Sequence, residues 1–207
     1  MEAQAFWEVI GAYNSATWWA SFAFLTLLLA ALLISYTTKI HFAIKCALGL
    51  FHLFIGIVFF GIFGTEPIQK FFALPLFISC GILFFYEAIS NHDDKPRKPN
   101  FFQIVLLSLY ALYPACSYML GHRFPHIVTY SMPCPVVCLG LSAYALYPRK
   151  NKVLLLLLTV WGLTGVKAIF FDAYEDMILL VCGIYGVLLL RKELLLPRIS
   201  VRDKETA

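Results

Sequence analysis

Apolar segments long enough to cross a membrane recur along the entire chain, and this feature limits the available folds most strongly. A helix needs about 20 apolar residues to span the hydrocarbon core of a bilayer. Six segments have this length, namely residues 17–37, 42–64, 71–89, 101–120, 128–147 and 153–171. A seventh segment, 177–190, reaches it only if residues 173–176 continue its helix. We therefore predict an all-α polytopic membrane protein, folded as a seven-transmembrane helix bundle.

Composition supports a chain whose main partner is the lipid bilayer. Of the 207 residues, 61% are hydrophobic and only 14% are charged, whereas about a quarter of the residues in soluble domains are charged. The net charge of +4 is small, and the basic residues are explained by orientation, so we expect no nucleic-acid partner. A homo-oligomer or a membrane complex remains open as a further partner.

The basic residues predict the direction of the spans, because cytoplasmic loops accumulate Lys and Arg. With the N-terminus outside and the C-terminus inside, thirteen basic residues fall on the cytoplasmic side and only Lys70 and Arg123 fall in outer loops. The loop between the sixth and seventh spans is purely acidic. This asymmetry predicts seven crossings of a bacterial inner membrane.

Three parts of the chain are distinguished. Residues 1–16 carry aromatic and apolar residues at helical spacing and predict an interfacial amphipathic segment. Residues 17–190 form the transmembrane domain, and residues 191–207 form a basic cytoplasmic tail. Spans one to three and five to seven run in the same directions, which allows a 3+1+3 repeat of the kind some small transporters use.

Polar residues gather at the predicted outer face, and they are the first candidates for function because polar groups are costly in lipid. The connection between spans four and five contains His122, and Cys134 follows between two prolines that we expect to free backbone carbonyls. Asp176 shares this level with Tyr13 and Asn14, and Lys167 is near enough to reach the acids. These six residues are predicted to line an outward-facing cavity.

Two kinds of chemistry are open for this outer group. His122 and Cys134 are ligand types for a divalent metal such as Zn. A thiol redox role, or a disulfide with Cys116, is the second. Alternatively, the histidine is an ordinary interfacial residue and the cysteine packs as a small hydrophobic side chain.

Fewer polar residues lie deeper in the predicted spans. Lys45 and Glu87 lie about one turn into adjacent antiparallel spans, so we predict a structural ion pair between them. His52, near the middle of span two, is a candidate proton switch, or else a histidine bonded to a neighbouring helix.

The sequence resembles a bacterial family of small multi-helix inner-membrane proteins known as domain of unknown function 6064. The resemblance rests on Phe6-Trp7, Tyr13-Asn14, Trp18, Tyr113-Pro114, Gly121-His122-Arg123-Phe124-Pro125, Pro133-Cys134-Pro135, Trp161, Gly165 and Asp176. Where the family pattern has Pro, Thr and an outer His, this chain has Trp19, Val136 and Phe59 or Phe60. The resemblance implies the fold and carries no activity.

Three functions are therefore open. The leading hypothesis is a small transporter or channel-like permease with an outward-facing polar site. The alternatives are a membrane-embedded enzyme that depends on a metal or thiol, and a structural or assembly subunit of a membrane complex. An enzyme requires His122 and Cys134 to converge, whereas a transporter requires a polar path toward His52.

Overall fold

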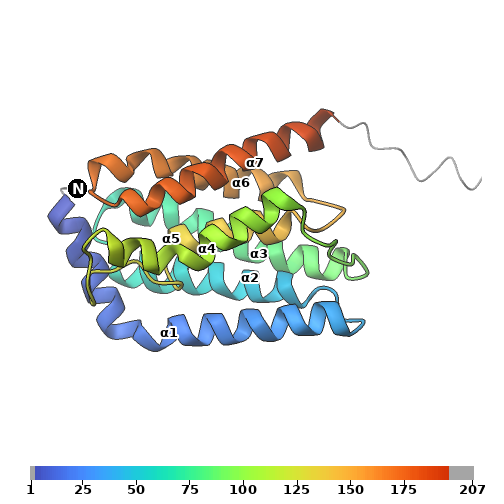
Figure 1. The fold of residues 1–207 in the computed structure, drawn as a ribbon, viewed down its shortest axis with the longest axis horizontal. Coiled ribbons are helices and arrows are strands. Elements are labelled where there is room, and N and C mark those ends of the chain that lie inside the picture. The colour runs from blue at the N-terminus through green and yellow to red at the C-terminus, as the bar shows by residue number, and fades with distance from the viewer. Residues whose placement is uncertain (1–2, 196–207) are drawn as a thin grey trace, which may run out of the picture.

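The computed structural model describes residues 3–195, and this part of the chain is helical with no sheet. Seven α-helices lie side by side along the long axis of the molecule (Figure 1). In chain order they are α1 (Ala3–Thr37), α2 (Ala43–Phe54), α3 (Leu74–Ser90), α4 (Phe101–Met119), α5 (Pro133–Tyr144), α6 (Lys152–Leu163) and α7 (Met177–Leu195). The predicted all-α fold is confirmed for these residues.

Within residues 3–195, five helical segments are long and apolar enough to cross a membrane. They are Ala3–Thr37, Ala43–Phe63, Gln69–Ser90, Phe101–Met119 and Lys152–Phe170. The beginning of α1 and the end of α7 lie at opposite ends of the bundle (Figure 1). We call these the N-terminal end and the C-terminal end.

Two predicted boundaries are wrong. The fifth span was expected from residue 128, but α5 begins at Pro133, because residues 120–132 form an irregular connection at the N-terminal end. Residues 173–176 do not continue the seventh helix as α-helix. They contain a short 3₁₀ turn, η4 (Tyr174–Asp176), and α7 instead extends in the other direction, to Leu195.

Helix geometry changes where the chain approaches the N-terminal end. The helix of α2 widens into a π-helix, η1 (Ile55–Phe63), and α3 is preceded by another, η2 (Gln69–Ala73). The helix of α6 tightens into a 3₁₀-helix, η3 (Thr164–Phe170). Such departures from α geometry are frequent near functional sites, and here they surround the cavity described below.

The core is built around α5, whose residues from 135 to 144 are all buried. A helix that is apolar on every side needs neighbours on every side. Two of them, α6 and α7, touch through their backbones. A Cβ added to Gly162 would lie 2.6 Å from the Cα of Gly183, so only glycine fits at this crossing.

The predicted interfacial segment, 1–16, forms the first part of α1 over its described residues. The helix is kinked at Thr17, whose φ of −124° and ψ of 24° are not helical. The segment before the kink therefore turns across the N-terminal end of the bundle (Figure 1) and buries Tyr13 and Asn14. Of the predicted tail, 191–207, residues up to Leu195 belong to α7, and the rest lies outside the described residues.

Candidate functional site

Two acidic side chains point into the bundle from the turn between α6 and α7. After η3, Asp172 adopts a left-handed φ of 52°, a conformation that Asp tolerates better than most residues. The reversal places Glu175 and Asp176 in the 3₁₀ turn η4 at the start of α7. The turn is closed by the Asp176 amide, which donates to the Ala173 carbonyl at 2.8 Å.

Asp176 joins three helices through its carboxylate. The Tyr113 hydroxyl of α4 donates to Oδ1 at 2.6 Å, and the Cys134 thiol of α5 donates to Oδ2 at 3.2 Å. Burial raises the pKa of Asp176 to about 6, against the opposing effect of these two hydrogen bonds, and nearby Glu175 raises it further. The carboxyl group therefore titrates close to physiological pH.

Glu175 has different neighbours from those of Asp176. Its side chain is almost fully buried, and Oε1 accepts a 2.6 Å hydrogen bond from the Ser117 hydroxyl. The other oxygen, Oε2, lies 3.9 Å from Nε2 of His122 and has no hydrogen-bond partner among the described residues. The two adjacent acids thus have different neighbours, one a histidine and the other a tyrosine and a thiol.

A cavity of about 160 Å³ reaches Asp176 and Cys134 from the N-terminal end. Its walls are mainly apolar and include several aromatic rings, among which Phe60 packs edge to face against both Phe59 and Trp161. Polar side chains are few along the lining and include Gln69, Thr164 and Lys167. We call this space the outer cavity.

The beginning of α1 borders the outer cavity. Trp7 stacks on the ring of His122 at a centroid distance of 3.9 Å and donates from Nε1 to the Phe171 carbonyl at 3.0 Å. Phe6 stacks on Phe171 and lines the cavity itself. The aromatic residues of this segment are therefore used for tertiary packing.

Tyr13 and Asn14 hold the connection between α4 and α5. The Tyr13 hydroxyl donates to the Ser131 carbonyl, and the Asn14 amide donates to the carbonyls of Pro125 and Ile127 at 2.6 and 2.7 Å. Because these bonds go to backbone groups, the two residues position the connection and do not contact the acids. They shape the surroundings of the outer cavity.

The structure brings the predicted outer residues to one end but gives them different partners. His122 faces Glu175, whereas Cys134 binds Asp176. Lys167 lines the outer cavity, yet no ion pair within 4 Å joins it to an acid in the described part of the chain.

Metal and disulfide chemistry receive no structural support at this end. Within residues 3–195, no group of three or more His, Cys, Asp or Glu side chains is placed to hold a metal ion. Both Cys116 and Cys134 are free thiols.

The expectation that Pro133 and Pro135 free backbone carbonyls is wrong. Pro133 is the first residue of α5, so both prolines lie in its first turn. Amides of the first turn have no acceptor within their own helix, and proline there leaves no carbonyl unpaired. The prolines start the helix and set the position of Cys134.

Sequence reasoning missed Tyr113 and Ser117, which donate to the two acids. The two residues are four apart and so lie on one face of α4. Two polar residues four apart, near the end of an apolar span, are the sequence signal that could have identified Tyr113 and Ser117 as site residues.

His52 is fully buried at the middle of the bundle. Its Nδ1 lies 2.8 Å from the Leu48 carbonyl, one turn earlier in α2, which requires Nδ1 to carry the proton. Nε2 is then an acceptor, and it has no partner among the described residues. The ring packs against Phe77 and Phe84.

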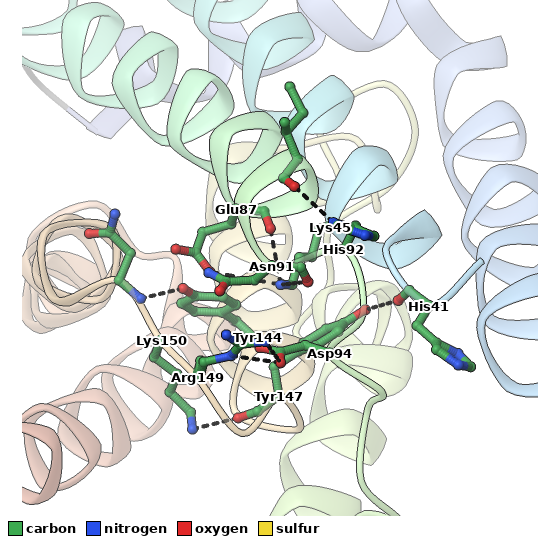
Figure 2. Close-up of polar contacts among 12 residues, drawn as sticks. His41, Lys45, Glu87, Asn91, His92, Asp94, Tyr144, Tyr147, Arg149 and Lys150 are labelled. Carbon is green, nitrogen blue, oxygen red and sulfur yellow. Dashed lines mark hydrogen bonds and ion pairs between the residues drawn. The ribbon is translucent and has the colours of Figure 1, made fainter. Parts of the chain in front are cut away.

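The C-terminal end holds the predicted inner pair (Figure 2). The Lys45 ammonium lies 3.7 Å from Glu87 Oε2, and it donates to the carbonyls of Glu87 and Asn91 at 3.2 Å each. It also lies 4.5 Å from the centre of the Tyr147 ring. The ammonium group therefore makes two hydrogen bonds and one ion pair, and the cation lies at the C-terminal end of α3, where the helix dipole favours positive charge.

Nearby loops are joined to the same end by further polar contacts, which Figure 2 also shows. Arg149 forms a 2.6 Å ion pair with buried Asp94, and Lys150 donates to the Tyr147 carbonyl at 2.7 Å. The ion pair, together with the hydrogen bond from the Arg97 amide to the Leu146 carbonyl, fastens the connections 91–100 and 145–151 to each other. The C-terminal end is thus a closed polar network, whereas the N-terminal end contains the outer cavity.

The fold and this site together define a protein that is helical over its described residues, with several helices suited to a membrane and a small cavity that ends on the half-buried Asp176. A family model described as a family of unknown function (DUF6064) matches residues 3–201, so the chain belongs to that family. Comparisons with curated proteins and with solved structures gave no significant match.

Proposed function

We propose that the protein is a small integral membrane permease of a bacterial inner membrane, with seven crossings, its N-terminus outside and its C-terminus in the cytoplasm. The observation that carries the proposal is the outer cavity, which ends inside the bundle on Asp176 and Cys134. Ionisable side chains inside a membrane bundle are costly and are retained where they face a ligand or ion pathway.

In this proposal, the described conformation is the one in which the outer cavity opens toward the outside. Below the outer cavity, Cys138 and Cys182 are completely buried, and the C-terminal end is closed by the network around Lys45. A permease has to open this closed half in a second conformation. The same cavity in a receptor would never open inward.

Thiol catalysis fits this geometry less well. The Cys134 thiol donates a hydrogen bond to the Asp176 carboxylate, whereas a nucleophile acts as the thiolate and is usually paired with a basic group. His122, the histidine predicted to act with Cys134, is directed at Glu175.

The permease proposal is tested by asking from which side α5 can be reached by water. Ser142 is fully buried, lies eight residues below Cys134, and accepts a near-isosteric Ser142→Cys substitution. In chains whose other cysteines are replaced by alanine, a membrane-impermeant thiol reagent is applied to either side of native membrane vesicles. We expect Cys134 to react from the outside and the thiol introduced by Ser142→Cys to react from the cytoplasmic side.

Leu29→Cys provides the matched control, because Leu29 is exposed on the outer surface of α1 and would face lipid. It should react from neither side, since thiol reagents need the thiolate and therefore water. If Ser142→Cys stays unreactive in vesicles but reacts after denaturation, the protein is a one-sided receptor and the permease proposal is wrong.

A further inference from the structure

The inner end of the outer cavity carries negative charge without a matching cation. The two groups that bond to Asp176 are the hydroxyl of Tyr113 and the thiol of Cys134, and both are neutral. No basic side chain lies within 4 Å of Asp176 in the part of the chain that the structure describes. A buried carboxylate in this state is stabilised by any cation that enters.

The charges around Asp176 also favour a cation at the inner end of the cavity. Glu175 adds a buried carboxyl group beside Asp176; its Oε2 lies 3.9 Å from His122 Nε2 and has no hydrogen-bond partner among residues 3–195. The nearest positive charge on the lining is that of Lys167, whose side chain is exposed and therefore screened by water. Asp176 is therefore the acidic group at the inner end of the outer cavity, and Lys167 is the basic group on its lining.

The aromatic rings in the walls of the outer cavity suit a cation that carries alkyl groups. Phe60 packs against Trp161 with ring centroids 5.4 Å apart and an interplanar angle of 71°, and Phe72 and Phe171 add further rings to the lining. Aromatic faces attract cations through their quadrupole, and the attraction grows when the cation has lost its water. They also accept the alkyl groups of the same ion.

We propose that the outer cavity binds a small organic monocation, an ammonium group with apolar substituents, with Asp176 as its counter-ion and Trp161 and Phe60 as its aromatic walls. This inference rests on the proposed function and names the class of ligand for that site. The cavity volume of about 160 Å³ is below the roughly 300–1,000 Å³ of pockets for drug-sized ligands, so the ion is small.

Other ligand classes fit less well. A divalent metal needs several oxygen, nitrogen or sulfur ligands, whereas this lining is mostly carbon and provides one carboxylate that already accepts two hydrogen bonds. An anion would be repelled by Asp176 and Glu175. A neutral apolar molecule would leave the carboxylate desolvated and unpaired.

The test compares three probes of one shape on the purified full chain. Choline carries the positive charge, 3,3-dimethyl-1-butanol is its uncharged counterpart, and 3,3-dimethylbutanoate carries a negative charge. Binding is measured by titration calorimetry and by protection of Cys134 from a thiol reagent. We expect choline alone to bind and protect.

Asp176→Asn should weaken choline binding at least tenfold. Asp172→Asn is the matched control, because Asp172 belongs to the same connection but is exposed, and Asn also tolerates its left-handed φ. It should leave binding unchanged. Trp161→Leu should lower affinity about three- to tenfold, and Trp161→Phe, which keeps an aromatic face, should retain most of it.

Acidification provides an independent readout. Protonation of Asp176 removes the counter-ion, so choline should bind about tenfold more weakly one pH unit below its pKa of about 6 than above pH 7. The titratable groups facing this carboxyl are Tyr113, Cys134 and Glu175, with Lys167 at the lining. Asp176→Asn, which has no such proton, should abolish the dependence.

Two outcomes would overturn the inference. Equal affinity for choline and the neutral alcohol would show that the cavity selects shape and not charge, while leaving the cavity as a ligand site. Absence of binding by any probe, with Cys134 still reactive from outside, would also overturn the ligand class. The permease proposal would then be decided separately by the labelling of Ser142→Cys.

Discussion

At the scale of single residues, the two ends of the bundle use buried charge differently. At the C-terminal end, Lys45 makes two hydrogen bonds and an ion pair with Glu87, which also accepts from the Asn91 amide at 3.0 Å. At the N-terminal end, Asp176 has two neutral donors and, among residues 3–195, no basic side chain within 4 Å. The first arrangement serves stability, and the second leaves charge available for a ligand.

The inner pair makes a prediction about stability. Lys45→Met should leave Glu87 buried without its cation and cost about 3–5 kcal/mol of unfolding free energy, as for other buried pairs that lose one partner. Lys45→Met combined with Glu87→Gln should recover much of this loss. Unfolding of the detergent-solubilised chain by a denaturing detergent measures both.

Lys95→Met serves as the control for this cycle, because Lys95 is exposed, and it should change stability little. Strictly additive losses from the two single variants would show that Lys45 and Glu87 do not interact.

At the scale of elements, close helix contacts decide where the cavity lies. The glycine crossing of α6 and α7 draws these helices together at Gly162 and Gly183. Just beyond it, a Cβ on Gly165 would lie 2.7 Å from the Asp176 carbonyl, so the tight approach continues to the acidic turn. The helix that carries Trp161 and the turn that carries Asp176 are thereby fixed against each other.

A substitution at this crossing should be costly. Gly162→Ala places a methyl group 2.6 Å from the Cα of Gly183, which the backbone has to relieve by separating α6 from α7. We expect a loss of about 1–3 kcal/mol, the range for overpacked cores. Thermal unfolding in detergent checks this.

Gly61→Ala is the comparison, because its methyl group would meet Leu74 Cδ1 at an ordinary 3.4 Å. Equal melting temperatures for the two variants would contradict a backbone contact between α6 and α7.

At the scale of the whole molecule, the seven helices alternate in direction between the two ends, and the beginning of α1 and the end of α7 lie at opposite ends (Figure 1). This geometry agrees with an odd number of crossings. The acidic turn η4 and the basic loop around Arg149 likewise lie at opposite ends. The proposed orientation rests on the excess of basic residues in the loops predicted to be cytoplasmic.

Reporter fusions test the orientation directly. Fusions after Lys152 and after Lys204 should report the cytoplasm, and a fusion after Asp172 should report the exterior, because each additional crossing reverses the side. A cytoplasmic signal at Asp172 would mean that α6 or α7 does not cross the membrane.

The sequence alone determined the helical class and the approximate position of each helix, because long apolar runs in one chain allow little else. It also indicated which polar residues share an end, since depth in a span follows from counting residues. Counting residues places Lys45 and Glu87 at one depth. It places Cys134 and Asp176 together at the opposite end.

Only the tertiary structure decided which of these residues meet. Rotation of a helix about its axis does not alter its apolar length, so counting could not show that Cys134 faces Asp176 while His122 faces Glu175. The roles of Tyr113 and Ser117 depend on the same rotation. The outer cavity depends further on the kink at Thr17 and on the 3₁₀ turns around Asp176, which arise from packing between distant segments and leave no periodic signal in the sequence.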